Sequence, residues 1–341
     1  MALRHPPLAP GWIDRPHHSA AIGDLPLEGG GVLRDCRLVW VEHGERNAAG
    51  DNTVLVCCAI GATHHRLDFL IGAGRALDPS RWHVIAIDAL GNGLSSSPSC
   101  SRAQPGRAFP AITIRDMVES QRRLLDSLGI GRLRAVAGAS MGGMQALQWA
   151  VSHPDRMERI VAMTAMARTS RWSQLMNELS RRMLFEDPEL MRPRESRAAM
   201  RLWAPFTQLV VASTPQGAER FADAAAMAAE ISALEERFLR HGPDPWDWLC
   251  QTRAYDAHDV GTTPGHAGTE EALRAIAAPT LLAAPALDLY NPAGASRDMA
   301  GTIPRAELVE IPSDRGHRAA TDARPEDARF LNDAIGRFLA Q

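Results

Sequence analysis

The chain has 341 residues, a formal net charge of -3, and 23% charged and 45% hydrophobic residues. This near-neutral balance gives no reason to expect nucleic acid or an anionic membrane as a partner, and the length suits one large domain with an insertion. The first residues contain no apolar leader, and no run approaches the ~18 apolar residues of a membrane span. Five cysteines without a disulfide spacing fit a reducing compartment, so we expect a cytoplasmic protein.

Short apolar runs typical of buried strands recur along the chain, and most are separated by segments of helical length. They cover residues 37–41, 53–60, 83–89, 133–139, 159–166, 280–288 and 306–311. Helices are expected after Thr113, where Asp116 can complete a capping box, and at the end of the chain from 325 to 339. This alternation predicts an α/β protein with a mostly parallel central sheet flanked by helices.

Between residues 168 and 278 the strand rhythm stops, and helical stretches rich in Arg, Met, Ala and Glu take its place. We interpret this segment as a helical lid inserted into a core domain formed by residues 1–167 and 279–341. The sequence contains no internal repeat and no low-complexity tract.

A serine stands between two glycines at the end of the expected strand 133–139, in the sequence Gly138-Ala139-Ser140-Met141-Gly142. In a sharp turn from strand to helix the serine hydroxyl is exposed, and the glycines let the two elements pass closely. This arrangement is the nucleophile elbow of an α/β-hydrolase fold. The alternative is a purely structural turn, but the strand and helix on its two sides favour Ser140 as a catalytic nucleophile.

A serine nucleophile needs a histidine to accept its proton and a carboxylate to stabilise the charged histidine. In α/β-hydrolases both follow the serine, the acid first. Asp288 stands at the end of the expected strand 280–288 and His317 follows the next strand, which predicts the triad Ser140, Asp288 and His317. Asp314 is the alternative acid, although it lies close to His317 in sequence. In the structural alternative, Asp288 only caps the next helix and His317 lies on a surface loop.

The tetrahedral intermediate also needs backbone donors for its oxyanion. We expect one from Met141, the residue after the nucleophile, and one from the loop at the end of the apolar run 53–60, which covers residues 58–63. In that loop Ile60 is the first candidate and Gly61 the second.

The same loop leads into His64, His65 and Asp68, which are metal-ligating residue types. Consecutive residues tend to point apart, and no second cluster in the sequence completes a ligand shell. We therefore predict no metal site.

Three longer segments are much more specific than the serine motif. They are DNTVLVCCAIG from Asp51 to Gly61, FPAITIRDMV from Phe109 to Val118, and GASMGGMQALQWAVSHPDR from Gly138 to Arg156. With them the chain resembles, over nearly its whole length, the homoserine O-acetyltransferase family. The resemblance implies an α/β-hydrolase-fold enzyme that takes an acetyl group from acetyl-CoA onto its serine and passes it to the hydroxyl of homoserine. It also implies no bound cofactor, and a homodimer formed through the lid.

Position by position, the resemblance assigns the triad to Ser140, Asp288 and His317, and the binding of the amino-acid carboxylate to Arg201. One position departs from the family: Arg318 stands where the family has an aspartate that contacts the substrate ammonium. A charge reversal within ~4 Å of an ammonium replaces attraction by repulsion. We therefore predict an O-acyltransferase that uses a small-molecule acyl donor, such as acyl-CoA, and an acceptor other than homoserine. The alternative is an esterase or thioesterase with the same triad.

Overall fold

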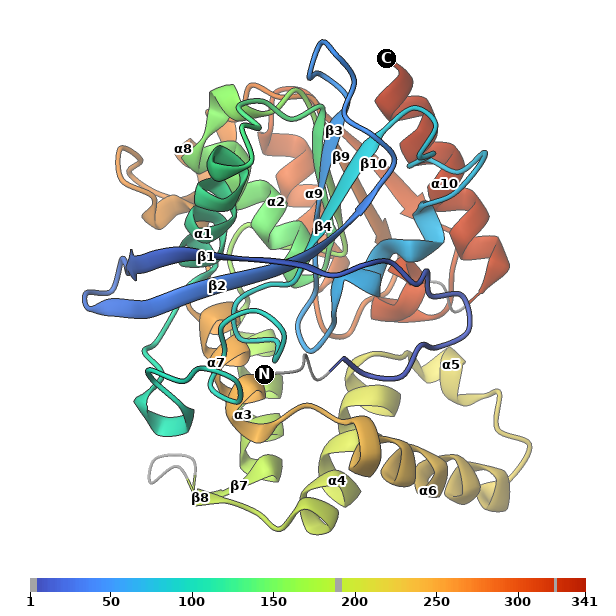
Figure 1. The fold of residues 1–341 in the computed structure, drawn as a ribbon. Helices are drawn as coiled ribbons and strands as arrows, with labels where there is room; N and C mark the ends of the chain where they lie inside the picture. Colours follow the sequence, from blue (N-terminus) through green and yellow to red (C-terminus); the bar gives the residue numbers. More distant parts are fainter. Residues whose placement is uncertain (1–4, 188–191, 322–323) are drawn as a thin grey trace.

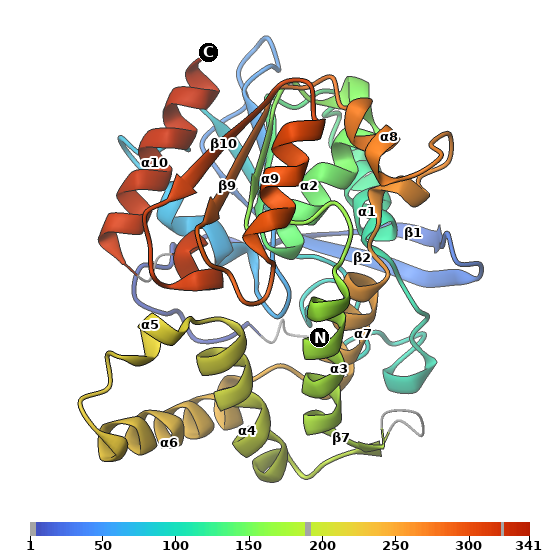
Figure 2. The ribbon, with the colours of Figure 1, turned by 180° about the vertical axis from the view of Figure 1, so that it is seen from behind.

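In the computed structural model of the protein, residues 5–187, 192–321 and 324–341 are described. Within them, an α/β core lies beside a layer of lid helices (Figure 1, Figure 2), and an eight-stranded sheet runs through the core in the order β1-β2-β4-β3-β5-β6-β9-β10. Its strands are β1 (His18–Pro26), β2 (Val32–His43), β3 (Thr53–Cys57), β4 (His83–Ile87), β5 (Ala135–Ala139), β6 (Ile160–Met163), β9 (Thr280–Pro285) and β10 (Ala306–Ile311).

The sheet is parallel from β4 to β10, whereas β2 pairs antiparallel with both β1 and β4. Every residue of β3, β4 and β5 is buried, which is expected of parallel strands with both faces covered. The predicted mostly parallel sheet is therefore confirmed.

Helices cover both faces of the sheet. One face packs against α1 (Ile114–Ser127), α2 (Met141–Ser152) and α9 (Ala293–Thr302), and the other against α10 (Pro325–Ala340) and the 3-10 segment His64–Leu70. The predicted capping box begins α1: the Thr113 side chain accepts from the backbone N–H of Asp116, and the Asp116 carboxylate accepts from the backbone N–H of Thr113. Such caps stabilise a helix end by about 1 kcal/mol.

The lid consists of helices below the core in Figure 1, together with a pair of short antiparallel strands. These elements are α3 (Arg171–Leu184), β7 (Phe185–Asp187), β8 (Arg192–Pro193), α4 (Ser196–Pro205), α5 (Pro215–Ala218), α6 (Ala224–His241) and α7 (Pro245–Asp256). The next helix, α8 (Thr269–Arg274), already lies with the core helices, and its Ala272 and Leu273 belong to the main hydrophobic core. The chain thus returns to the core before residue 278.

A proline shapes the part of the lid that faces the core. Pro205 ends α4 inside the helical stretch, where it cannot donate a backbone N–H. The chain then continues as a π-helical turn over Phe206–Val211, a form that is frequent at functional sites.

The first strand was not expected from the sequence. Most residues of β1 are exposed, because β1 is the edge strand of the sheet, and an exposed edge strand lacks the apolar run that marks buried strands. Among the described residues, no helix is long and apolar enough to cross a membrane.

Candidate active site

Ser140 lies in the sharp turn between β5 and α2. Its φ is 56° and its ψ is -124°, a strained backbone for a residue with a side chain. Close packing explains the flanking glycines: a Cβ on Gly142 would overlap the backbone of Cys57 in β3, and one on Gly138 would overlap the backbone of Gly142. The strand and the helix can therefore form this turn only with glycine at both positions.

The structure brings Ser140, Asp288 and His317 together through two hydrogen bonds. Nε2 of His317 lies 2.8 Å from Oγ of Ser140, and Nδ1 lies 2.8 Å from Oδ2 of Asp288. All three residues are buried. Oδ1 of Asp288 accepts the backbone N–H groups of Tyr290 and Asn291, at 2.8 and 2.9 Å, so Oδ2 is directed at the histidine.

The alternative acid lies elsewhere. The Asp314 carboxylate forms a surface ion pair with Arg324, while its backbone carbonyl accepts the Thr214 hydroxyl. The geometry therefore favours Asp288 as the partner of His317.

Two buried tyrosines, which sequence reasoning did not select, hold the loop after β9. Burial raises the pKa of both Tyr255 and Tyr290 well above the usual range, so both hydroxyls donate. Tyr290 donates to Oδ1 of Asn177 at 2.6 Å, and Tyr255 donates to Oδ1 of Asn291. The Tyr290 ring also packs edge-on against His317, with centroids 5.0 Å apart. Tyr290 follows Asp288 by two residues, and this position in the sequence could have identified Tyr290 as a residue of the site.

The two expected oxyanion donors come from the turn after the serine and from the loop after β3. Met141 is the first residue of α2, where backbone N–H groups have no partner within the helix. Ile60 lies in the turn closed by the hydrogen bond from Ala62 to Ala59 and lines the pocket. The N–H of Gly61, the second candidate, already donates to Oε1 of Gln251 at 2.8 Å, which favours Ile60.

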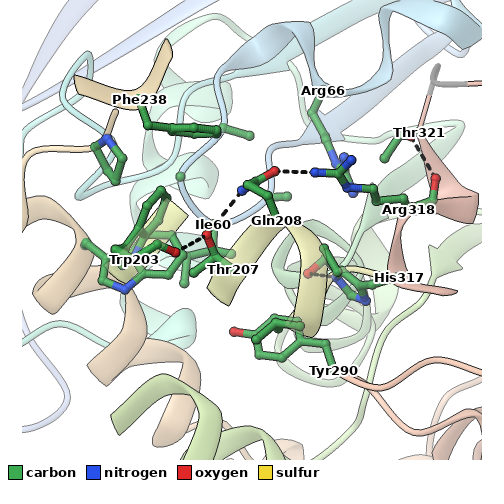
Figure 3. A pocket seen from close by; sticks show the side chains of 18 of the residues that line it. Ile60, Arg66, Trp203, Thr207, Gln208, Phe238, Tyr290, His317, Arg318 and Thr321 are labelled. Carbon is green, nitrogen blue, oxygen red and sulfur yellow. Dashed lines mark hydrogen bonds between the residues drawn. The ribbon is translucent and has the colours of Figure 1, made fainter. Parts of the chain in front are cut away.

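A cavity of about 590 Å³ opens above Ser140 and His317. Its walls come from the lid, from the loop after β3 and from the N-terminal segment; they include Pro6, Trp12, Ile60, Trp203, Phe206 and Phe238. Figure 3 shows the aromatic rings of Trp203 and Phe238 at one end of the view and the guanidinium groups of Arg66 and Arg318 at the other.

Among the described residues that line this cavity, the acidic and basic side chains are all arginines, apart from histidines. Arg66, Arg237, Arg315 and Arg318 line it, and the described lining residues include no aspartate or glutamate. Arg318 donates to Oε1 of Gln208 in the π-helical turn. Burial, with the nearby Arg315 and Arg237, lowers the pKa of Arg318 to about 10, so it stays charged at neutral pH.

Arg201 does not lie where the sequence analysis expected it. Its side chain is 68% exposed and pairs with Glu235 of α6 at 3.2 Å, and it is not among the described residues that line the cavity. The buried face of α4 carries Met200 and Trp203 instead. Arg201 follows Met200 by one residue and therefore points outward.

The sheet topology and the turn at Ser140 are those of the α/β-hydrolase fold, and the chain matches the alpha/beta hydrolase fold family over residues 52–320. It is 32% identical to a homoserine O-acetyltransferase from Nostoc punctiforme over 336 residues, which cover 91% of this chain and 92% of the relative. The chain therefore belongs to the homoserine O-acetyltransferase family, as its sequence motifs indicated.

Two solved structures that the chain resembles are esterases. One is an acetylester hydrolase from Corynebacterium glutamicum, with a TM-score of 0.87 and 25% identity over 96% of both chains. The other is the acetyl esterase MekB, with a TM-score of 0.85 and 29% identity over 96% of this chain and 97% of that one.

Proposed function

We propose that this protein is an O-acyltransferase that forms an acyl-enzyme at Ser140 and passes the acyl group to a hydroxyl acceptor without an ammonium group. The observation that carries this proposal is the cavity above the hydrogen-bonded serine and histidine, lined by four arginines and, among its described residues, by no carboxylate. The described lining thus offers no acidic group that could receive an ammonium.

The side chains support a two-step reaction. His317 takes the proton of Ser140 while Oγ bonds to the acyl carbon of the donor, and the leaving group, such as the thiolate of CoA, departs with that proton. In the second step the acceptor hydroxyl gives its proton to His317 and bonds to the same carbon. Oγ of Ser140 then leaves and is reprotonated. Asp288 stabilises the charged histidine in both steps, and the N–H groups of Met141 and Ile60 bind the oxyanion.

Both groups expected to recognise homoserine are missing from the cavity. Arg201 lies on the outer face of α4, and Arg318 replaces the aspartate that the family directs at the ammonium. At ~4 Å and an effective dielectric constant of about 20, a guanidinium repels an ammonium by about 4 kcal/mol, or about a thousandfold in affinity. The same arginines favour an uncharged or anionic acceptor or acyl group, since guanidinium binds carboxylate and phosphate in bidentate geometry.

Hydrolysis is a second candidate function, in which water takes the place of the acceptor. The two esterase structures with which this chain shares 25% and 29% of its residues favour it. The triad serves both reactions, and the difference lies in whether the lid holds an acceptor hydroxyl in line and excludes water.

A single assay separates the two functions. Purified protein is incubated with acetyl-CoA, or with p-nitrophenyl acetate, in the presence and absence of homoserine, an uncharged alcohol and a hydroxy acid. Release of CoA or nitrophenol that rises with an acceptor, together with a new ester in the mass spectrum, identifies a transferase. Release that is independent of every acceptor identifies a hydrolase.

The role of Arg318 is tested by Arg318→Asp, with Arg201→Asp as the matched control outside the cavity. We expect Arg318→Asp to raise kcat/KM for homoserine acetylation and to lower it for anionic substrates, and Arg201→Asp to change neither by more than about twofold. Efficient homoserine acetylation by the wild-type protein would contradict the proposal. It would indicate that this protein catalyses the reaction named for its relatives.

The lid surface supports a homodimer, as the family resemblance implied. Trp172, Leu175 and Leu179 are 50%, 49% and 40% exposed and recur at helical spacing along one face of α3. An exposed apolar stripe of this kind is typical of an interaction surface. Sedimentation of the wild-type protein as a monomer at micromolar concentration would contradict this assembly.

A further inference from the structure

Three histidines that are far apart in the sequence meet beside the loop after β3. His5 and His17 belong to the N-terminal segment, and His64 begins the 3-10 segment His64–Leu70. Each can offer one ring nitrogen such that the three nitrogens lie within 4.8 Å of one another. The N-terminal segment, dark blue in Figure 1, runs between the core and the lid before it enters β1, which brings its histidines to the core.

His64 is already arranged as a ligand. Its Nδ1 lies 2.9 Å from Oδ2 of Asp88, and its backbone N–H donates to Oδ1 of the same carboxylate at 2.9 Å. The side chain is 1% exposed, and its Nε2 has no hydrogen-bond partner among the described residues. A carboxylate that accepts a hydrogen bond from Nδ1–H of a histidine fixes the tautomer in which Nε2 carries a lone pair for a metal, as in most histidine metal sites.

A second histidine and carboxylate pair supports His5. Nδ1 of His65 lies 2.6 Å from Oδ2 of Asp68, and Nε2 of His65 lies 3.1 Å from Nε2 of His5. This contact holds the His5 ring in place beside the core.

We propose that His5, His17 and His64 form a site for a divalent transition metal, and that Zn²⁺ is its natural occupant. Three imidazole nitrogens suit zinc, which takes histidine nitrogens at about 2.0–2.1 Å in tetrahedral geometry. Such bonds place the nitrogens about 3.4 Å apart, so His5 and His17 move inward by about 1 Å on binding, while His64 stays fixed by Asp88. A water molecule or His65 completes the shell.

The metal has a structural role in this arrangement, because it fastens the N-terminal segment to the core. Pro6, Pro7 and Trp12 of that segment line the catalytic cavity. Trp12 also stacks on His65, with ring centroids 4.3 Å apart, and the backbone N–H of Ile13 donates to Asp68. Zinc would thus order one wall of the cavity without contacting the substrate. The zinc site does not depend on the proposed function. A negative zinc-binding test would leave the proposed acyl transfer untouched, and a negative acyl-transfer assay would leave the zinc site untouched.

The sequence analysis rejected a metal site because it considered only His64, His65 and Asp68. The fold adds His5 and His17, which lie 59 and 47 positions before His64. No spacing rule connects these positions, so only the path of the N-terminal segment reveals them.

The test uses the full-length protein, stripped of metal by chelation and titrated with ZnCl₂ by calorimetry. We expect one zinc ion per chain, a higher Tm with zinc, and slower hydrogen exchange in residues 5–17. The His17→Gln variant changes a half-buried ligand with little risk to folding, and we expect it to weaken zinc binding at least tenfold. His18→Gln is the matched control, because the neighbouring His18 stacks on Trp40 and is outside the cluster.

Cobalt serves as a second probe. Co²⁺ bound to the wild-type protein should show the visible absorption of a tetrahedral site, and His17→Gln should lose it. Absence of zinc binding to the wild-type protein would overturn the proposal. An equal loss of affinity in His18→Gln and His17→Gln would also overturn it, because binding would then be nonspecific.

Discussion

The substitution Asp288→Asn would isolate the contribution of the carboxylate behind His317. The backbone N–H groups of Tyr290 and Asn291 hold the position of Oδ1, so the amide oxygen of an asparagine would occupy it. The amide NH₂ would then face Nδ1 of His317, which has to accept its hydrogen bond. The histidine proton would move to Nε2, toward Ser140, where a proton acceptor is needed.

The size of the effect follows from the distance between the two side chains. At 2.8 Å and an effective dielectric constant of about 20, the attraction between a charged histidine and a carboxylate amounts to about 6 kcal/mol. Loss of this attraction in the transition state corresponds to a decrease of about 10⁴-fold in kcat, since 1.36 kcal/mol is tenfold in rate.

The assay is release of nitrophenol from p-nitrophenyl acetate, with Tm as the check that the variant is folded. Asp314→Asn is the control, because Asp314 pairs with Arg324 at the surface, and we expect it to retain wild-type activity within about threefold. If Asp288→Asn keeps more than a tenth of the wild-type kcat, or if Asp314→Asn has the larger effect, the assignment of the acid is wrong.

Two further predictions concern the triad and the lid. Ser140→Ala and His317→Ala should each lower kcat by ~10⁴-fold or more, and the double variant should be scarcely slower than either, because residues that act as a unit are not additive; additive losses in the three variants would contradict this. Asp247 lies in α7 and accepts a hydrogen bond from Ser99, and burial raises the pKa of its carboxyl group to about 7. The folded protein therefore keeps the carboxyl proton of Asp247 at pH values where the unfolded chain has lost it. The free energy of unfolding, measured with urea, should therefore fall by about 2–3 kcal/mol for this group between pH 5 and pH 8, and Asp247→Asn should remove that decrease.

Local patterns in the sequence predicted the parts of the fold that depend on near neighbours. The glycines around Ser140 and the capping box at Thr113 and Asp116 act over five residues or fewer, and both features are present in the structure. Burial on both faces gave the parallel strands a continuous apolar pattern. The edge strand β1 has one partner and mostly exposed side chains, so its sequence contains little that distinguishes it from a loop.

Side chains that meet only through the tertiary fold could not be predicted in this way. The histidine cluster depends on how the N-terminal segment crosses the core. The contact between Gln208 and Arg318 depends on a π-helical turn after Pro205. Neither arrangement leaves a periodic pattern in the sequence.

The structure brings Ser140, Asp288 and His317 together but places Arg201 outside the cavity. The reason is that different parts of the fold fix the positions of these side chains. Ser140, Asp288 and His317 come after β5, β9 and β10, and the carboxyl ends of parallel strands meet at one edge of a sheet, where ligands and reactive groups gather. The backbone hydrogen bonds of the sheet thus set their separation. Arg201 lies on a lid helix, where each step of one residue turns a side chain by about 100°. The packing of the lid therefore decides which side chains face the cavity, so a chain can keep the family's residues around Ser140 while its cavity presents different side chains to a substrate.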